Sequence, residues 1–420
     1  MRTLYSLAWY LLAPAIAVRL LLLAIRDPAW RRGLGERLGR IKTRAPRGIW
    51  VHAASVGEIQ ATLPLINALR LKYPDLPLTL TSFTPSGREH ALRMLPEDIC
   101  CALLPFDFPG AVRRFLERVK PRIAIVVETE LWPNLYAACR RAEVPVVIVS
   151  ARVTESSARA YGRMRRLTAA TLSIPEVISA QTEVDAQRIQ ALGADPTRVT
   201  IGGNIKFDFR LPEGIHQRTA ALRADLQLGA RPVWIAASTH DGEDGPVLAA
   251  HRALLTAHPD ALLVLAPRHP GRADAVAGLI EAAGFRSGRR SSKASAGAGV
   301  QVYLLDTLGE LAVFYGLADV TFIGGTLVPV GGHNLLEPAA FGLPLLCGPH
   351  VDSVRRIHGL LAEGGAVRGV VDADSLAAEL VGLFGDDDAR RRVGAAGRRV
   401  LEQNRGAVER ALHLVAGILR

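Results

Sequence analysis

The chain has 420 residues, of which 49% are hydrophobic and 22% are charged. This length exceeds what one hydrophobic core supports, so we expect two domains of roughly 150–200 residues each. Lysine and arginine number 51 against 40 acidic residues, a net charge of +11, which fits nucleic acid, an anionic membrane or a phosphorylated substrate. Aromatic residues make up only 5%, and neither zinc-finger spacing nor an aromatic-spaced basic stretch occurs, so nucleic acid is the least favoured partner.

Residues 3–25 form one apolar stretch that we interpret as a membrane anchor. A membrane-spanning helix needs roughly 20 apolar residues, and the length fits. Pro14 and Arg19 weaken the case for a span, so the stretch either crosses the membrane or lies in its interface. No small-residue cleavage site follows, which argues against a removed signal peptide.

A basic collar follows the apolar stretch, opposed only by Asp27 and Glu36. Positive charge on this side of an anchor predicts that the body of the chain is cytoplasmic. The same charge suits anionic headgroups, and a solvated linker is the alternative. Reduced cysteines agree with a cytoplasmic body, since Cys100 and Cys101 are adjacent and poorly placed to pair. The collar residues are Arg26, Arg31, Arg32, Arg37, Arg40, Lys42, Arg44 and Arg47.

From Gly48 onward, apolar strands alternate with amphipathic helices, which predicts parallel, doubly wound sheets. The expected strands of the first half are 49–53, 78–82, 101–105, 123–127, 146–150, 177–181 and 199–201. Those of the second half are 233–238, 262–266, 300–305, 320–323 and 343–346. Residues 287–299 are polar and of low complexity, and we expect a mobile loop without a chemical role.

This pattern divides the chain into an α/β fold of two Rossmann-like domains. The predicted regions are an anchor and collar (1–47), a first domain (48–206), a linker (207–230), a second domain (231–403) and a C-terminal helix (404–420).

The stretch 322–349 has the strongest local signal for a ligand site. Two glycine pairs let backbone approach a ligand, and we expect Asn334 to be the N-cap of a helix with Glu337 in its first turn. A helix start offers free N–H groups to an anion. The alternative is a strand, a turn and a helix joined by ordinary glycine turns.

Polar clusters follow most of the other strands, where parallel sheets bind ligands. Two sheets with facing loops predict a cleft with one substrate on each half. Glu58 is the candidate base, with a role at the helix start as its alternative. Glu128 and Glu130 form a Glu-x-Glu pair of which we expect one to face the cleft, while Lys206 and Arg268 are candidates for holding phosphate.

A metal site is not expected. His240, Asp241, Glu243 and Asp244 fit an acidic helix start better than a ligand set, because no second group has matching spacing. Neither G-x-G-x-x-G in the first sheet nor G-x-x-x-x-G-K-S/T is present, which argues against a Rossmann dehydrogenase and a P-loop NTPase.

Taken together, the motifs resemble the 3-deoxy-D-manno-octulosonic acid (Kdo) transferases of lipopolysaccharide synthesis. They are WVHAASVGE (50–58), ETELWPN (128–134), GGNIKFD (202–208), STHDGED (238–244), PRHP (267–270), DTLGEL (306–311) and the glycine-rich segment 324–350.

The resemblance implies a GT-B glycosyltransferase that inverts configuration, uses no metal, takes CMP-Kdo as donor and lipid IVA as acceptor. By motif match, Glu58 falls on the family's general base, and Glu128 and Lys206 on its transition-state stabilisers. Its CMP-binding segments fall on Pro267, Arg268, Leu308, Gly309, Glu310, Asn334, Leu335, Leu336 and Glu337.

Two other functions remain open from the sequence. One is another enzyme of the same fold, such as a lipid-linked N-acetylglucosaminyltransferase or a UDP-sugar 2-epimerase. The other is a non-catalytic scaffold that binds anionic lipid through the basic collar.

Overall fold

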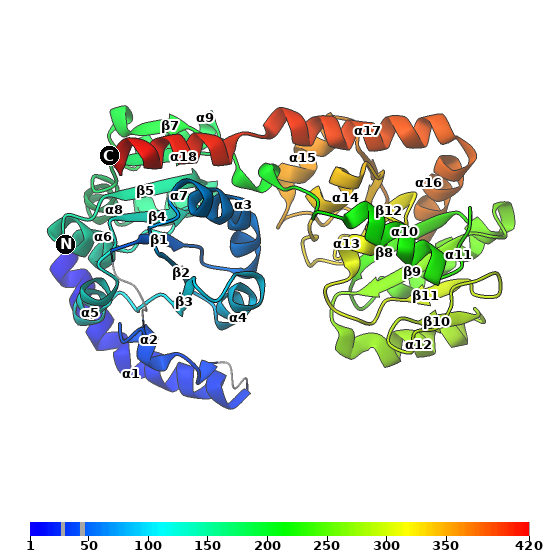
Figure 1. Ribbon diagram of the computed structural model, residues 1–420, viewed down its shortest axis with the longest axis horizontal. Helices are drawn as coiled ribbons and strands as arrows, with labels where there is room; N and C mark the ends of the chain where they lie inside the picture. Colours follow the sequence, from blue (N-terminus) through cyan, green and yellow to red (C-terminus); the bar gives the residue numbers. More distant parts are fainter. Residues whose placement is uncertain (27–29, 43–46, 420) are drawn as a thin grey trace. The chain divides into compact units, whose positions relative to one another are not determined.

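The computed structural model describes residues 1–26, 30–42 and 47–419 (Figure 1). Two units account for the chain: unit 1 comprises Met1–Asp208 with Asn404–Arg420, and unit 2 comprises Phe209–Gln403. Asp27 and Arg44, which the collar prediction includes, lie outside the described residues.

Unit 1 is built on a seven-stranded sheet with the order β3-β2-β1-β4-β5-β6-β7. All its neighbouring strands are parallel, as the strand–helix alternation predicts. In β1, Ile49 and Val51 face one core while Trp50 faces the other, which explains why the strand is apolar throughout. The strands are β1 (Ile49–His52), β2 (Leu78–Ser82), β3 (Cys100–Leu103), β4 (Ile123–Val127), β5 (Val146–Ala151), β6 (Val177–Ala180) and β7 (Val199–Ile201).

Helices cover both faces of this sheet. One face packs against α3 (Val56–Lys72), α4 (Pro85–Met94) and α18 (Ala407–Ile418), and the other against α5 (Pro109–Val119), α6 (Pro133–Arg141), α8 (Arg165–Leu172) and α9 (Glu183–Ala191). The remaining helices of the unit are α1 (Arg2–Arg26), α2 (Leu34–Arg37) and α7 (Glu155–Gly162). The C-terminal helix α18 therefore completes the core of unit 1 through Val408 and Val415 (Figure 1).

The predicted anchor is the single long helix α1, and Pro14 lies inside it. Residues Arg2–Ile25 have a mean hydropathy of 2.0, with 6% of the most apolar window buried, and are long enough to cross a membrane. The start of the helix rests on unit 1: Ser6 Oγ donates to Asn134 Oδ1 (2.9 Å), and the Trp9 ring meets Phe108 edge-on at 5.2 Å. Most other apolar side chains of α1 stay exposed, which makes the helix a candidate anchor.

Unit 2 contains a second parallel seven-stranded sheet with the order β10-β11-β9-β8-β12-β13-β14. Its strands are β8 (Val233–Thr239), β9 (Leu262–Pro267), β10 (Ser287–Arg289), β11 (Val302–Leu304), β12 (Val320–Ile323), β13 (Leu345–Cys347) and β14 (Val367–Gly369). Its helices are α10 (Ile215–Asp225), α11 (Asp244–Ala257), α12 (Ala273–Ala282), α13 (Leu311–Tyr315), α14 (Leu336–Phe341), α15 (Arg355–Glu363), α16 (Ala373–Gly385) and α17 (Asp387–Asn404).

The segment 207–230, predicted as a linker, is mostly part of unit 2. Helix α10 occupies its middle, and Ile215, Leu222, Leu226 and Leu228 are buried in the unit's core. The sequence pattern is weak because only three positions of this 11-residue helix are buried, and one of them is Thr219. Its apolar positions are recognisable only once the sheet that they cover is known.

Candidate functional site

The acids predicted for catalysis lie at one edge of the sheet of unit 1. Strands β1 and β4 are neighbours there, and the chain order of the sheet reverses between them. Glu58 follows β1, while Glu128 and Glu130 follow β4. In doubly wound sheets, ligands bind outside the carboxyl ends of the strands at such a reversal. The topology therefore brings Glu58 close to Glu128 and Glu130, which lie 70 and 72 residues further along the sequence.

Glu58 is fixed by the start of helix α3. Its Oε2 accepts from the Ala54 backbone N–H (2.8 Å) and its Oε1 accepts from the Ser55 hydroxyl (3.0 Å), while Ser55 caps the helix by accepting from the Glu58 N–H. Burial raises the pKa of Glu58, and the negative charges of Glu128 and, more weakly, Glu130 raise it further. The helix-start role therefore does not exclude a basic role, because the bonds at the helix start also hold the carboxylate in one orientation.

Glu128 and Lys206 form an ion pair at the same edge. The Lys206 Nζ lies 2.7 Å from Glu128 Oε1, with both side chains mostly buried. Glu128 adopts a positive φ of 61°, which is unfavourable for a residue with a side chain and is concentrated at functional sites. Lys206 is held by its own backbone N–H, which donates to Asn204 Oδ1 (2.9 Å).

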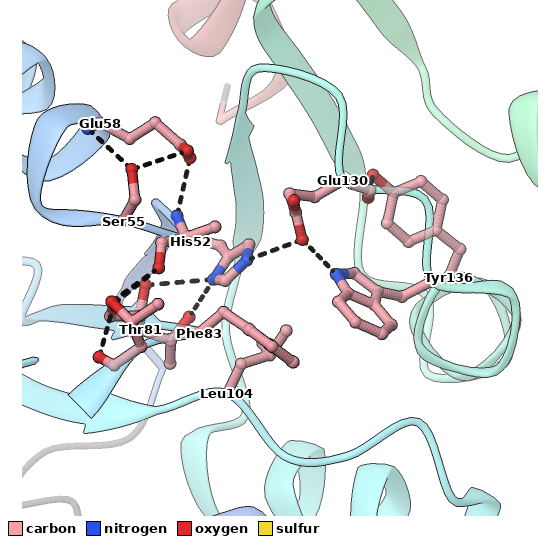
Figure 2. A network of polar contacts seen from close by, with 12 residues as sticks. His52, Ser55, Glu58, Thr81, Phe83, Leu104, Glu130 and Tyr136 are labelled. Atoms are coloured by element: carbon pink, nitrogen blue, oxygen red, sulfur yellow. Dashed lines mark hydrogen bonds and ion pairs between the residues drawn. The ribbon is translucent and has the colours of Figure 1, made fainter. Parts of the chain in front are cut away.

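That one of Glu128 and Glu130 faces the cleft stays a prediction. Strand β4 ends at Val127, and the backbone at Glu128 is left-handed, so the alternation of a regular strand does not extend to these two residues. Glu128 contacts Lys206, and Glu130 accepts from the Trp132 indole N–H (3.0 Å). Figure 2 shows a further neighbour that sequence reasoning missed: His52, at the end of β1, lies between Thr81 and Glu130.

The predicted donor residues of unit 2 cluster around the strand ends of its sheet. Pro267 ends β9, and the side chain of the next residue, Arg268, is exposed and makes no hydrogen bond or ion pair with the described residues. His240 follows β8, and its Nε2 lies 2.8 Å from His333 Nε2. Burial lowers the pKa of His333 to about 4, and the positive charge of Arg268 adds to the effect. Burial also lowers the pKa of His240, which favours the neutral form of both imidazoles, so that one ring N–H can donate to the other ring.

Glu243, an acid of the dismissed metal cluster, holds the glycine-rich loop. The side chain is fully buried, and its two oxygens accept from the backbone N–H groups of His240 (2.8 Å), Gly325 (2.7 Å), Thr326 (3.0 Å) and Leu327 (3.0 Å). The carboxylate thus occupies the nest of N–H groups that the glycines create. These backbone amides already donate to Glu243, so an anionic ligand would need other hydrogen-bond donors.

Glu310 is held by an arginine from the segment 287–299, and the expectation that this whole segment is a loop is wrong for its first three residues. Residues Ser287–Arg289 form strand β10, and Arg290 binds the Glu310 carboxylate in a bidentate contact, with Nε donating to Oε2 (3.1 Å) and Nη2 to Oε1 (2.6 Å). This contact is the largest cause that lowers the pKa of Glu310. Leu308 and Gly309, in the same turn, remain accessible: Leu308 is 77% exposed, and Gly309 has a φ of +84°. The low-complexity sequence does not predict strand β10, because the strand is held by pairing with β11 and by contacts such as that of Arg290 with Glu310.

The helix after the second glycine pair begins later than predicted. Helix α14 starts at Leu336 with Leu335 as its N-cap, so Asn334 lies one residue before the cap; its Oδ1 accepts from the Leu336 N–H (3.0 Å). Glu337 does lie in the first turn. Burial raises its pKa to about 7, and its carboxylate has no partner among the described residues. Glu337 is thus a partly buried acid whose carboxylate makes no hydrogen bond to the described residues.

One residue of the predicted basic collar is not at the surface. Arg37 is 3% exposed, donates to the carbonyl oxygens of Leu104 (3.1 Å) and Phe83, and lies over the Phe83 ring. It cannot meet a lipid headgroup. The exposed cations among the collar's described side chains are Arg31, Arg32, Arg40, Lys42 and Arg47.

Within the ranges 1–26, 30–42 and 47–419, no group of three or more histidine, cysteine, aspartate or glutamate side chains is arranged to hold a metal ion. The four cysteines are free thiols, in agreement with the sequence.

Comparison with known proteins relates the chain to one group of enzymes. The family model described as 3-deoxy-D-manno-octulosonic-acid transferase (kdotransferase) matches residues 32–209. The chain is 39% identical to a 3-deoxy-D-manno-octulosonic acid transferase of Haemophilus influenzae, covering 99% of this chain and 98% of the relative. It is 37% identical to that of Bordetella pertussis, covering 98% of each. A solved glycosyltransferase of Rickettsia africae shares the fold, with a TM-score of 0.56 at 13% identity, over 89% of this chain and 99% of that one.

Proposed function

The chain belongs to the Kdo transferase family, glycosyltransferases of lipopolysaccharide synthesis with a GT-B fold, and from this premise we propose that it transfers Kdo from CMP-Kdo to lipid IVA. The acceptor is an acylated glucosamine disaccharide phosphate. The transfer inverts configuration and needs no metal ion. The observation that carries the proposal is the assembly of Glu58, Glu128 and Lys206 at the strand reversal of unit 1.

Glu58 is the general base of the proposed reaction. The acceptor hydroxyl oxygen bonds to the anomeric carbon of Kdo, and the bond from that carbon to the CMP phosphate oxygen breaks, with its electron pair leaving on CMP. Glu58 takes the hydroxyl proton. Its raised pKa makes it a stronger base than an exposed carboxylate, and the bonds from Ala54 and Ser55 keep it in one orientation. A positioned base contributes roughly 10²- to 10⁴-fold to a rate.

Lys206 supplies a fixed positive charge to the developing anion, and Glu128 positions it. The contact of 2.7 Å orders an otherwise flexible ammonium group, and a preorganised charge stabilises a transition state without reorganisation. The strained backbone of Glu128 supports this role, since such conformations are retained where function requires them.

Unit 2 binds the CMP moiety. Arg268 has a free guanidinium and suits a phosphate, which it can bind with two parallel N–H groups. Glu310 and Glu337 suit hydroxyl groups of the ribose, Glu310 because Arg290 orients it and Glu337 because its carboxylate is unpartnered. Pro267, Leu308, Gly309, Asn334, Leu335 and Leu336 shape the surroundings of these groups.

The protein acts at the cytoplasmic face of the inner membrane in this proposal. Helix α1 is apolar and largely exposed, and Arg31, Arg32 and Arg40 present charge next to it. Each such cation near an anionic bilayer contributes about 1 kcal/mol. Vesicles of anionic lipid should therefore bind the chain more tightly than vesicles of neutral lipid.

Mass analysis of the product tests the proposal. Purified protein should convert CMP-Kdo and lipid IVA to a Kdo-bearing lipid, CMP rather than UDP should compete with the donor, and EDTA should have no effect. Glu58→Gln should lose at least about 10²-fold in kcat while its affinity for CMP is unchanged. Competition by UDP alone would favour another enzyme of the same fold, and a fully active Glu58→Gln would refute the base assignment.

A further inference from the structure

His52 is a buried imidazole whose position core packing does not explain. It ends strand β1 and is 0% exposed. Its Nδ1 lies 3.0 Å from Thr81 Oγ1 and 3.1 Å from the Thr81 carbonyl oxygen. Its Nε2 is buried without a hydrogen-bond partner among the described residues and lies 3.9 Å from Glu130 Oε2 (Figure 2). A buried nitrogen without a hydrogen bond is unfavourable. We therefore asked what the position of Nε2 near Glu130 contributes to the site.

The neighbours of His52 determine which nitrogen carries the hydrogen. The Thr81 hydroxyl accepts from the Trp50 indole N–H (2.8 Å), which leaves its own hydrogen free to donate to His52 Nδ1. The Thr81 carbonyl already accepts from the Ala53 N–H (3.0 Å). The opposite tautomer would direct a lone pair at the Glu130 carboxylate. The favoured imidazole therefore has its hydrogen on Nε2, directed at Glu130.

Glu130 is held on one side and free on the other. Its Oε2 receives the Trp132 indole N–H at 3.0 Å and faces His52, while its backbone carbonyl accepts from the Tyr136 hydroxyl at 2.8 Å. Its Oε1 has no partner among the described residues, and the side chain is 28% exposed. The carboxylate thus presents one oxygen, in a fixed direction, to a hydroxyl of a ligand.

An aromatic surface adjoins this carboxylate. The Trp132 ring stacks on Phe83, with centroids 5.3 Å apart and an angle of 24°. Both rings are partly exposed, and Arg37 lies over Phe83 at 4.8 Å, which holds the stack from below the surface. An apolar ring face beside an oriented hydroxyl acceptor matches a pyranose, which has a C–H face and hydroxyls at its rim.

We propose that Glu130 and Trp132 form the subsite for the sugar ring of the acceptor, and that His52 is the positioning residue that fixes the Glu130 carboxylate. The inference rests on the proposed function, in which Glu58 meets the acceptor. Strands β1 and β4 are adjacent, with His52 in register with Val126, so the subsite lies next to the base. Glu130 binds a hydroxyl other than the one that reacts, and Trp132 carries the ring.

Steady-state kinetics of the full chain with lipid IVA and CMP-Kdo test the subsite. Glu130→Gln should raise the KM for lipid IVA by about 10- to 100-fold, the effect of one charged hydrogen bond, with the KM for CMP-Kdo within about twofold of wild type. Trp132→Phe keeps a ring but loses the N–H, and should raise the acceptor KM less than Trp132→Ala does.

A pair of substitutions separates the positioning role of His52 from a structural one. The amide nitrogen of Asn can take the place of Nδ1, while that of Gln can reach the place of Nε2. His52→Asn should therefore raise the acceptor KM several-fold, and His52→Gln should restore it. His251→Asn is the matched control. His251 lies in unit 2 and is 0% exposed, like His52, and its Nδ1 accepts from the Trp234 indole N–H at 3.1 Å. It should lower the unfolding temperature without changing the acceptor KM.

The outcomes distinguish this inference from the proposed function. An inactive wild type would overturn both. A fully active Glu58→Gln would refute the base assignment, and with it the placement of the subsite next to the base, while Kdo transfer itself would stand. If wild type is active and Glu58→Gln is not, an unchanged acceptor KM in Glu130→Gln and Trp132→Ala overturns the subsite alone. Equal acceptor KM values in His52→Asn and His52→Gln overturn the positioning role of His52.

Discussion

The buried carboxylate of Glu243 offers a sharp test of how the glycine-rich loop is held. In Glu243→Gln the shape of the side chain is kept, but one accepting oxygen becomes an NH₂ group. The wild-type oxygens each accept from two backbone N–H groups, those of His240 and Gly325 on Oε2 and those of Thr326 and Leu327 on Oε1. The remaining oxygen of the glutamine can still accept from one pair of backbone N–H groups. The other pair then faces the glutamine NH₂ group, which cannot accept a hydrogen bond.

The magnitude follows from the two N–H groups that lose their acceptor. Each buried, unpaired donor costs about 1–3 kcal/mol, so Glu243→Gln should lower the free energy of unfolding of unit 2 by about 2–6 kcal/mol. For a unit of about 200 residues, a loss of about 4 kcal/mol lowers the unfolding temperature by about 8–16 °C. Because the same loop leads to Asn334, the affinity for CMP should fall as well.

Thermal and urea unfolding, with CMP binding measured in parallel, check this expectation. The matched control is Asp241→Asn, which removes the same charge two residues away, where the side chain is fully exposed and only 3.5 Å from Arg272. A surface pair of this kind contributes little, so the control should unfold close to the wild-type temperature. If Glu243→Gln lost no more stability than Asp241→Asn, the loop would not depend on the buried carboxylate.

Three further predictions concern the donor residues of unit 2. The pKa of Glu337 in the folded chain, about 7, exceeds its unfolded value, so its ionisation destabilises the fold as pH rises from about 4.5 to above 7. In urea titrations, Glu337→Gln should increase the free energy of unfolding by up to about 3 kcal/mol at pH 8 and should not change it at pH 4. An equal increase at both pH values would contradict the argument that burial raises this pKa. Arg290→Gln should raise the KM for CMP-Kdo about tenfold, because Glu310 loses its bidentate partner, whereas Lys293→Gln, an exposed cation in the same segment, should leave that KM unchanged. Arg268→Ala should weaken CMP binding about 10- to 100-fold in calorimetry without lowering the unfolding temperature, since its side chain has no partner to lose; a large loss of stability would show that Arg268 is structural.

The sequence alone determined the architecture and the edge of the sheet at which the candidate catalytic residues lie. Continuous apolar strands such as 123–127 and 146–150 are buried on both faces, and that burial is a local property of composition. Glu58, Glu128 and Lys206 could be located because each follows a strand end, and in a parallel sheet those ends share one edge.

The tertiary structure alone decided which partners those residues have. Arg37 has the composition of a surface cation and is buried, because Phe83 and Leu104 come from elsewhere in the chain to receive it. Arg290 belongs to a low-complexity segment and yet orients Glu310 across a strand. In the sequence, His52 is simply the last residue of an apolar strand. The fold places Glu130, which follows β4, near its Nε2. Such contacts depend on distance in space, which local periodicity does not encode. The sequence therefore indicates the edge of the sheet at which these residues lie, and only the fold determines which side chains contact one another.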